Sequence, residues 1–269
     1  SDTSEEPQRK SFVGRRDAII AAASAVGGLV AGWLLPDDRG VPPDSVADIG
    51  ALYHRWSTPG HALDLPVPDW GDRPASHQIY PDADRVQLPE PEWDGVQEVR
   101  QVLNARRSWR DYARRSLPMT ALSALVHAAQ GITQDRLAFR AAPSAGALYP
   151  IELYPVVHDV DALLPGVYHY AVQAHALERL EAGDFRRRVT RAGIYQGFLG
   201  EAAVCFVLSA VFQRSRWKYR ERAYRYVLLE AGHVGQNIYL AATALGLGAC
   251  AVGAFYDRQL NDQIGRAHV

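Results

Sequence analysis

Hydrophobic positions recur with the periods of helices and strands from Val96 onward. The spacing predicts one helix starting near Val96, a second from Pro118 to a stop at Gly131, and a long third helix at 221–245. Strand-like runs lie at 151–158, 167–170, 176–180, 202–212 and 249–255, and the second and third of them look like a hairpin. Because helices and strands are interleaved with this hairpin, the pattern favours an α+β sandwich over a purely doubly wound sheet.

The N-terminal region carries no charge from Ala18 to Leu35, directly after the pair Arg15-Arg16 and Asp17. As a helix this stretch would rise about 27 Å, just short of a bilayer's hydrocarbon core. Paired arginines before an apolar stretch rich in Ala and Gly resemble a twin-arginine export signal. We expect residues 1–35 to be such a signal or a membrane anchor, with 18–35 available for membrane association; a buried N-terminal helix is the alternative.

The charge around this stretch predicts its orientation. Basic residues precede it and acidic residues follow it, so the positive-inside rule places the main domain outside the cytoplasm. We therefore expect a membrane-anchored or exported bacterial protein on the periplasmic or extracytoplasmic side, with a cytoplasmic location as the alternative.

Proline dominates the next segment, because 10 of the 16 prolines lie between Pro36 and Pro91. Such a composition is typical of an extended linker. We expect 36–95 to be a Pro-rich linker or N-terminal extension, interrupted by a short helical patch at 49–56.

Composition narrows the function classes. A chain of 269 residues with 48% hydrophobic and 22% charged residues is neither disordered nor a small disulfide-stapled module. A net charge of -1 argues against a nucleic-acid binder. Cys205 and Cys250 lie in apolar surroundings and are expected to be small buried hydrophobic residues. Only Lys10 and Lys218 are lysines, against 27 arginines.

A cluster of donors follows the first predicted helix. Arg106, Arg107, Ser108 and Arg110 place three guanidinium groups and a hydroxyl within five residues. Arginine presents a planar fork that binds phosphate through two hydrogen bonds, so the cluster suits a phosphate monoester. An exposed basic turn is the alternative.

Small residues at 143–150 form a second candidate. Ser144 and Gly146 stand between Pro143 and Pro150, where small side chains let the backbone approach a flat ligand closely. The strand end at 252–255 offers similar access to backbone N–H groups. An ordinary turn leading into a strand is the alternative for 143–150.

The pair Lys218-Tyr219 is the third candidate, surrounded by Arg214, Arg216, Arg220, Arg222 and Arg225. Neighbouring cations disfavour an ammonium group and are expected to lower the pKa of Lys218 toward the range of a base. A solvated basic loop is the alternative. Glu230 and His233 have the spacing of half a di-iron site, but the chain lacks the other half, so we predict no metal site.

These motifs occur in a characteristic order. Arg-Arg-Ser-x-Arg at 106–110 is followed by Pro-Ser-Ala-Gly-Ala-Leu-Tyr-Pro at 143–150, Gly-Val-Tyr-His-Tyr at 166–170, a run containing Glu-Ala-Gly-His at 224–237, and Gly-Ala-Cys-Ala-Val-Gly-Ala-Phe at 248–255. The series resembles the SagB-type dehydrogenase branch of the nitroreductase superfamily over about 96–261. The resemblance implies a nitroreductase-like α/β sandwich, with a central, mostly antiparallel sheet flanked by helices, in an obligate homodimer.

The resemblance also implies an FMN cofactor, whose chemistry the protein tunes. Carried over by position, Arg106, Arg107, Ser108 and Arg110 would hold the phosphate and ribityl side or the pyrimidine edge. The isoalloxazine ring would be lined by Pro143, Ser144, Ala145 and Gly146, and Gly253 and Ala254 would present backbone N–H groups to its N5 and O4 side.

Activity is implied in the same way. The branch includes dehydrogenases that oxidise thiazolines and oxazolines in peptides, and Lys218 and Tyr219 match a pair thought to help remove the azoline proton as hydride goes to flavin N5. Other relatives reduce quinones or nitro compounds with NAD(P)H as a transient electron donor. A flavin-binding scaffold without turnover is the third alternative, and the substrate class is a small molecule or peptide.

The C-terminus departs from the branch. Its members continue past the strand at Gly253 with an arm that lies on the partner subunit, whereas this sequence ends 15 residues after Ala254. The ending at 263–269 resembles a translated sequencing-adapter read. We therefore expect an FMN domain at 96–262 that is truncated at its C-terminus, and an artefactual tail at 263–269; finding these codons in a genomic context would refute the second expectation.

Overall fold

A computed structural model describes residues 19–24, 50, 53, 57, 71–93 and 96–263. Most of the predicted signal or anchor at 1–35, the first half of the Pro-rich segment and residues 264–269 lie outside the described residues. Their expected roles remain predictions.

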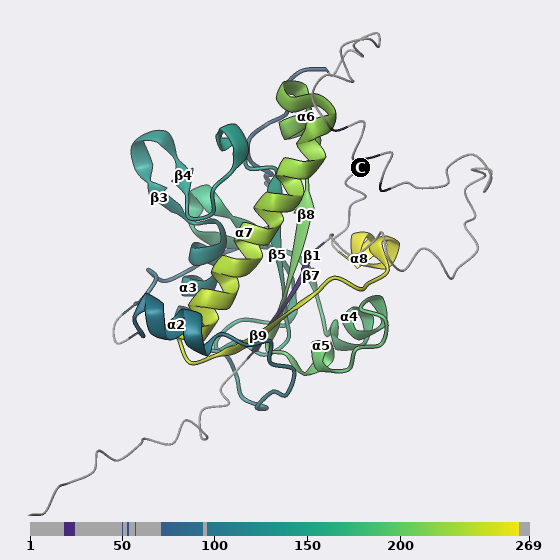
Figure 1. The fold of residues 1–269 in the computed structure, drawn as a ribbon. Coiled ribbons are helices and arrows are strands. Elements are labelled where there is room, and N and C mark those ends of the chain that lie inside the picture. The colour runs from purple at the N-terminus through teal and green to yellow at the C-terminus, as the bar shows by residue number, and fades with distance from the viewer. Residues whose placement is uncertain are drawn as a thin grey trace, which may run out of the picture.

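A seven-stranded sheet forms the centre of the molecule, in the order β2-β7-β6-β5-β8-β1-β9 (Figure 1). Its strands are β1 (Ile19–Ser24), β2 (Asp84–Gln87), β5 (Ile151–Val157), β6 (Gly166–Ala171), β7 (Ala176–Ala182), β8 (Val204–Ala210) and β9 (Gly248–Val252). All pairs from β2 to β8 are antiparallel, whereas β1 pairs in parallel with β8 and β9. The predicted α+β fold with a mostly antiparallel central sheet is confirmed.

Helices cover both faces of this sheet. They are α2 (Val99–Ala105), α3 (Met119–Gln130), α4 (Arg186–Ala192), α5 (Phe198–Glu201), α6 (Gln213–Tyr219), α7 (Ala223–Ala244) and α8 (Asp257–Gln263). Alternate side chains of β8 divide between the faces: Phe206 packs in the cluster beneath α3 and α7, and Val207 packs in the cluster beneath α4, α5 and α8. No helix among the described residues is both long and apolar enough to cross a membrane.

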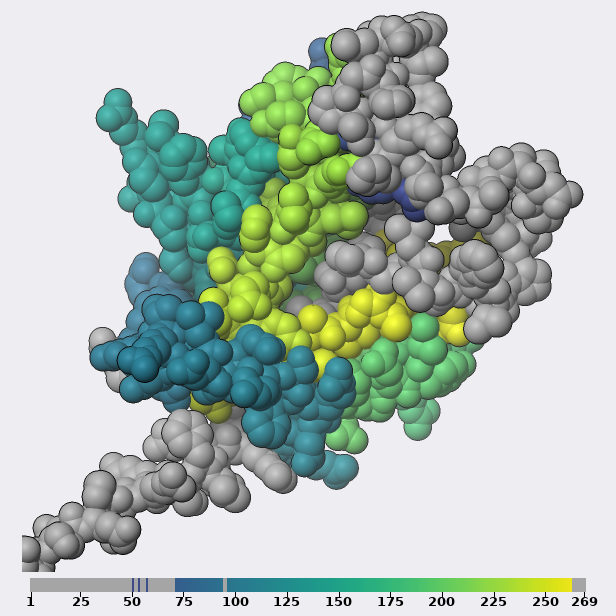
Figure 2. All heavy atoms as spheres, viewed as in Figure 1, coloured from purple at the N-terminus to yellow at the C-terminus, as the bar shows by residue number. Residues whose placement is uncertain are grey.

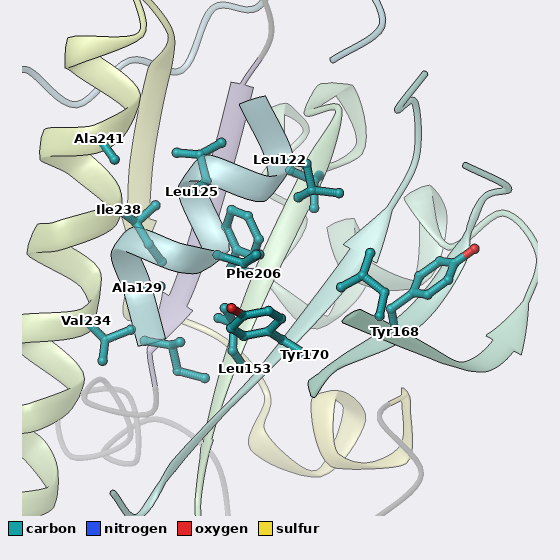
Figure 3. Packing of buried hydrophobic residues seen from close by; sticks show 14 of the residues in the cluster. Leu122, Leu125, Ala129, Leu153, Tyr168, Tyr170, Phe206, Val234, Ile238 and Ala241 are labelled. Atoms are coloured by element: carbon teal, nitrogen blue, oxygen red, sulfur yellow. The ribbon is translucent and has the colours of Figure 1, made fainter. Parts of the chain in front are cut away.

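The larger core lies between α7, α3 and the sheet. In Figure 3, Leu125 and Ala129 of α3 face Ile238 of α7, while Phe206 and Tyr170 come from the sheet. This packing fixes α7 against the strands. The helix is therefore a rigid support for the side chains that it carries.

Segment 71–93 belongs to the folded body, which differs from the linker expected there. β2 adds an edge strand to β7, and Leu88 is buried in the larger core. Arg85 forms a 2.6 Å ion pair with the buried Glu178. An edge strand tolerates nearby prolines, because one side of it needs no hydrogen-bond partner. The proline-rich composition therefore did not reveal that β2 pairs with β7.

Ile19–Ser24 forms β1 inside the sheet, in parallel register with both neighbours. An uncharged segment suits such a position, because interior parallel strands have neighbours on both sides. The remainder of the predicted anchor lies outside the described residues, and membrane targeting stays a prediction.

Two further elements were not predicted. β3 (Ile132–Gln134) and β4 (Phe139–Arg140) form a hairpin that protrudes beside the body in Figure 1. The segment before the long helix forms α6 and a 3-10 turn at 220–222, so Lys218 and Tyr219 lie at the end of a helix rather than in a loop.

Candidate functional site

Lys218 and Tyr219 at the end of α6 meet the loop that contains Gly146. A Cβ atom built on Gly146 would lie 2.6 Å from Tyr219 Oη and 2.9 Å from Lys218 Nζ. The Lys218 ammonium group also lies 5.2 Å from the centre of the Tyr219 ring. Two motifs that are 72 positions apart in the sequence are therefore one site, with the amine and the phenol converging over the glycine.

Backbone strain is concentrated in this loop. Gly146 has φ +64°, and the non-glycine residues Ala147 and Tyr149 have φ +52° and +47°. A side chain in this left-handed region costs about 1–3 kcal/mol, so other contacts must hold the loop in place. Ser144 Oγ accepts a hydrogen bond from Tyr149 N–H at 2.9 Å and closes the turn.

Two buried arginines support the loop from below. Arg214 donates from Nη1 to the Tyr149 carbonyl oxygen at 3.1 Å. Arg140 stacks on the Tyr149 ring at 4.5 Å and donates to Gln130 at 3.0 Å. Tyr149 is thus held through its backbone and its ring.

Buried carboxyl groups face these cations. Glu152 forms an ion pair with Arg214 at 2.5 Å, with both side chains 3% exposed. Burial alone would raise the pKa of Glu152, but hydrogen bonds from His169 and Arg214 outweigh it and hold the pKa at about 2. Burial raises the pKa of Glu230 to about 7, although Ser144, the Ile151 backbone and both arginines act in the opposite direction.

The cations near Lys218 are partly engaged elsewhere. Arg214 is buried, Arg216 contacts Glu221 at 3.3 Å, and Arg222 and Arg225 reach Ser57 at 3.1 and 2.7 Å. Lys218 itself is exposed. Several of the arginines near Lys218 in the sequence therefore have other partners in the fold.

The arginine motif lies at the other end of α7, next to β9. Trp109 N–H donates to the Ala249 carbonyl at 2.9 Å, and Ser108 Oγ lies 3.0 Å from Tyr239 Oη. Tyr239 Oη in turn accepts from Ala251 N–H at 2.6 Å. This phenol joins the motif to the last strand.

The charges of the arginine motif suit a phosphate. Arg106 lies over the Tyr239 ring at 5.2 Å, Arg110 over the Phe198 ring at 5.9 Å, and Arg107 donates to backbone carbonyls of its own helix end. Within the described part of the chain, none of the three forms an ion pair with a carboxylate. The donor set therefore fits the phosphate of a nucleotide cofactor.

Gly253 and Ala254 follow β9 and are exposed. The Ala254 carbonyl accepts from Gln196 Nε2 at 3.2 Å, which fixes the strand end against the segment before α5. Their expected N–H groups toward a flavin, like the expected flavin contacts of Pro143, Ser144 and Ala145, remain predictions.

Helix α7 relates the two halves of the site. Glu230 contacts the loop and Tyr239 contacts the arginine motif, and the nine-residue step from one to the other rises about 13.5 Å along the helix. Figure 2 shows this helix exposed between the hairpin β3–β4 and the region of α2. The two candidate clusters therefore lie toward opposite ends of α7, the arginine motif at one end and the Lys-Tyr pair at the other.

Sequence reasoning missed three residues that hold the candidate site together. Arg140 and Glu230 contact the loop at 143–150, and Tyr239 contacts the arginine motif. Glu230 falls on the buried stripe of α7 with Val227, Ala231 and Val234, so its position in the apolar period was the available signal. His233 is exposed while Glu230 is buried, and no metal cluster occurs among the described residues, so the two do not act as a pair. Both cysteines are buried and free, as predicted.

Comparison with known families gives one match over most of the folded body. Residues 103–268 match the model described as Nitroreductase family. MJ1384 of Methanocaldococcus jannaschii, which carries a provisional nitroreductase name, is 38% identical over 183 residues, which are 67% of this chain and 89% of that protein.

Two processing proteins share shorter regions. The trifolitoxin-processing protein TfxB of Rhizobium leguminosarum bv. trifolii is 35% identical over 113 residues, 40% of this chain and 30% of that protein. The microcin B17-processing protein McbC of Escherichia coli is 33% identical over 121 residues, 39% of this chain and 40% of that protein. The chain therefore spans less than half of either processing protein.

Solved structures show the same fold. A crystal structure from Ralstonia eutropha with a provisional nitroreductase name has a TM-score of 0.60 at 29% identity, covering 72% of this chain and 87% of that one. A similar structure from Anabaena variabilis has a TM-score of 0.62 at 28% identity, covering 70% of this chain but 39% of that one.

Proposed function

The chain belongs to the nitroreductase family of FMN-dependent oxidoreductases, and from this premise we propose that it is a SagB-type dehydrogenase that oxidises an azoline ring in a peptide to an azole. The observation that carries the proposal is the convergence of Lys218 Nζ and Tyr219 Oη over Gly146. Azoline oxidation releases a proton besides the hydride, and an amine beside a phenol is suited to take that proton. The processing roles in the names of TfxB and McbC support a peptide substrate.

The residues present fit FMN. Arg106, Arg107, Ser108 and Arg110 would hold its phosphate and ribityl side, the segment from Pro143 to Gly146 would line its ring, and Gly253 and Ala254 would face N5 and O4. When bound, FMN supplies the acceptor for hydride, that is, for two electrons and one hydrogen. Because residue 146 is a glycine, no Cβ stands against Lys218 Nζ and Tyr219 Oη at this point of the segment.

Lys218 and Tyr219 would manage the proton. Aromatising an azoline removes one hydride and one proton, so a base must take the proton that does not leave as hydride. In this proposal Lys218 takes it at Nζ, and the Tyr219 hydroxyl holds the ring nitrogen or the departing proton in line by hydrogen bonding. Arginine cannot replace this amine, because a guanidinium group does not lose its proton in proteins.

Replacing Lys218 with Ala tests the assignment. The variant should slow azoline-dependent flavin bleaching about 100-fold, because a general base contributes at least that factor. FMN should stay bound, since Lys218 is not part of the donor set. Anaerobic stopped-flow absorbance measures the rate, and mass spectrometry detects the loss of two hydrogen atoms from the peptide.

Lys218→Arg is the matched control, because it keeps a long basic side chain that cannot accept a proton, and it should be as slow as the alanine variant. Unchanged bleaching in Lys218→Ala would refute the base assignment. Bleaching by NAD(P)H with quinone reoxidation, and none by the peptide, would instead support a quinone or nitro reductase, which the provisional name of MJ1384 favours. Yellow protein bleached by neither donor would indicate a flavin-binding scaffold.

We further propose a homodimer that is exported or held at the membrane by its N-terminal region; a span through the whole of 18–35 does not fit this fold, because residues 19–24 form β1 between β8 and β9. Val99 and Leu103 of α2 and the nearby Trp109 are 73%, 55% and 50% exposed, an apolar group that a second copy would cover. Light scattering of the purified full chain should give twice the mass of 29.7 kDa, and the protein should fractionate with the membrane or periplasm. A monomeric mass or a purely cytoplasmic fraction would refute the corresponding part.

A further inference from the structure

Glu230 is a buried carboxyl group in the middle of α7, with 2% of its surface exposed. It hydrogen-bonds the hydroxyl of Ser144 and the backbone N–H of Ile151, the first residue of β5. Its second oxygen, Oε1, has no partner among the described residues. Burying a carboxyl group that lacks a full set of partners costs free energy of folding, so its contacts with the loop are expected to serve a purpose.

Ser144 extends the hold of this carboxyl group into the loop. Its Oγ already accepts from Tyr149 N–H at 2.9 Å, and a serine hydroxyl has one hydrogen to donate. That hydrogen goes to Glu230. A single side chain of α7 is therefore connected to Ser144 before Gly146, and to Tyr149 and Ile151 after it.

Gly146 lies between these anchored residues, directly beneath Lys218 Nζ and Tyr219 Oη. We propose that Glu230 is a positioning residue. By anchoring the loop, it fixes the position of Gly146 relative to Lys218 Nζ and Tyr219 Oη. The catalytic part of this role rests on the proposed function. The mechanical part, the anchoring of the loop, does not.

Two charged groups act on Glu230 directly, and two more titratable groups lie near them. Arg140 of β4 and Arg214 of α6 both favour its ionised form, and Glu152 of β5 and His77 of the N-terminal extension lie near the same two guanidinium groups. Burial nevertheless outweighs these cations and raises the pKa of Glu230 to about 7. The carboxylate that holds the loop thus ionises near neutral pH at a cost to the fold.

Removing the charge of Glu230 should therefore raise the unfolding free energy and at the same time loosen the loop. Because the pKa of folded Glu230 lies above its ordinary value, the ionised group destabilises the fold as the pH rises through about 7, and below the ordinary value the effect disappears. Glu230→Gln removes the charge and keeps one acceptor oxygen. The variant should therefore be more stable than the wild type at pH 8, equal to it near pH 4, and looser at the loop.

The test uses the full chain carrying Glu230→Gln. Hydrogen exchange of the 145–149 amides, measured without added flavin, should be about tenfold faster at pH 8, the effect of weakening one buried hydrogen bond. The thermal midpoint should rise at pH 8. With FMN and an azoline peptide, kcat should fall about tenfold with little change in KM, because a misplaced group slows the chemical step.

Two other variants separate the causes. Ser144→Ala cuts the link while leaving the buried charge, so it should speed exchange in the loop without raising the midpoint. Glu201→Gln makes the same replacement at an exposed glutamate of α5 and should change neither.

Exchange at 145–149 that is equal in wild type and Glu230→Gln would overturn the proposal, whatever the activity. A midpoint that falls at pH 8 together with activity would also overturn it, since that is the signature of a merely structural residue. Faster exchange in a chain that oxidises no azoline would uphold the anchoring role and refute the proposed function instead.

Discussion

Replacing Gly146 with Ala should lower turnover at least about 1,000-fold while leaving the protein folded. The added Cβ would lie 2.6 Å from Tyr219 Oη and 2.9 Å from Lys218 Nζ, both far ends of flexible side chains. Those ends can move away cheaply, so stability suffers little from the contact. The reaction suffers greatly, because the displaced atoms are the ones assigned to the proton.

Part of the loss of stability in Gly146→Ala comes from placing a side chain at positive φ. A second glycine with positive φ and no close neighbours measures this backbone cost alone. Gly246 has φ +73° with open space around its Cβ position, so Gly246→Ala should lose about 1–2 kcal/mol of unfolding free energy and keep its turnover. Gly232 lies in α7 with open space and helical geometry, so Gly232→Ala should gain about 1 kcal/mol of unfolding free energy and keep its turnover.

Stopped-flow kinetics and urea unfolding of the three variants give a direct comparison. Gly146→Ala should match Gly246→Ala in stability and differ from it in rate. If the two variants turned over equally well, the convergence of Lys218 and Tyr219 over Gly146 would have no bearing on the reaction.

The individual parts of this site were predictable, but their meeting was not. Small residues at 143–150 and a lysine beside a tyrosine are local features, visible in a window of a few residues. Their contact depends on the antiparallel pairing of β5 with β8, which aligns Ile151 with Ala210 and so brings the loop before β5 next to α6 after β8. Pairing between strands that are distant in the chain has no signal in a single sequence.

The fold itself was largely predictable because its buried elements have clear periods. β8 was recognised as a continuous apolar run, and it is buried along its whole length. β2 was missed because only its Val86 is partly buried, so its hydrophobic alternation is weak. Its place in the sheet depends on the edge of β7 and on the Arg85–Glu178 pair, which are tertiary features.

Glu230 shows how a correct observation led to an incomplete interpretation. The spacing to His233 resembles half of a metal ligand pair, but His233 is exposed while Glu230 is buried. The more informative fact was that Glu230 occupies a core position of α7, between Val227 and Val234. A carboxyl group in a core stripe must have partners, and the search for those partners leads to the loop.

Glu152→Gln should destabilise the protein by about 3–5 kcal/mol at pH 7, the usual cost of breaking a buried ion pair. Glu152 Oε1 lies 2.5 Å from Arg214 and accepts from Gln78 N–H at 3.1 Å, and Oε2 lies 3.1 Å from His169. The His169 ring reaches Glu178 on its other side at 3.0 Å. Removing the charge leaves the Arg214 guanidinium buried without a carboxylate, and it loosens segment 71–93 through Gln78.

The same carboxylate should make stability depend on acid. The pKa of Glu152 is about 2 in the fold, below its ordinary value, so its contribution is complete above pH 4.5 and is lost as the pH falls toward 2. Urea unfolding at pH 7 and pH 3 should therefore show a smaller difference between wild type and Glu152→Gln at the lower pH.

Glu181→Gln provides the matched control, because Glu181 is also a strand residue, on β7, that pairs with an arginine of a helix, Arg188 of α4. Its partner Arg188 lies 3.0 Å away, but the two side chains are 50% and 48% exposed. An exposed pair contributes less than about 1 kcal/mol, so this variant should unfold almost like the wild type at both pH values. Equal losses in the two variants would mean that burial adds nothing to the Glu152 pair, and the loop above Arg214 would then have to be held by the Arg140 stack and by Glu230 alone.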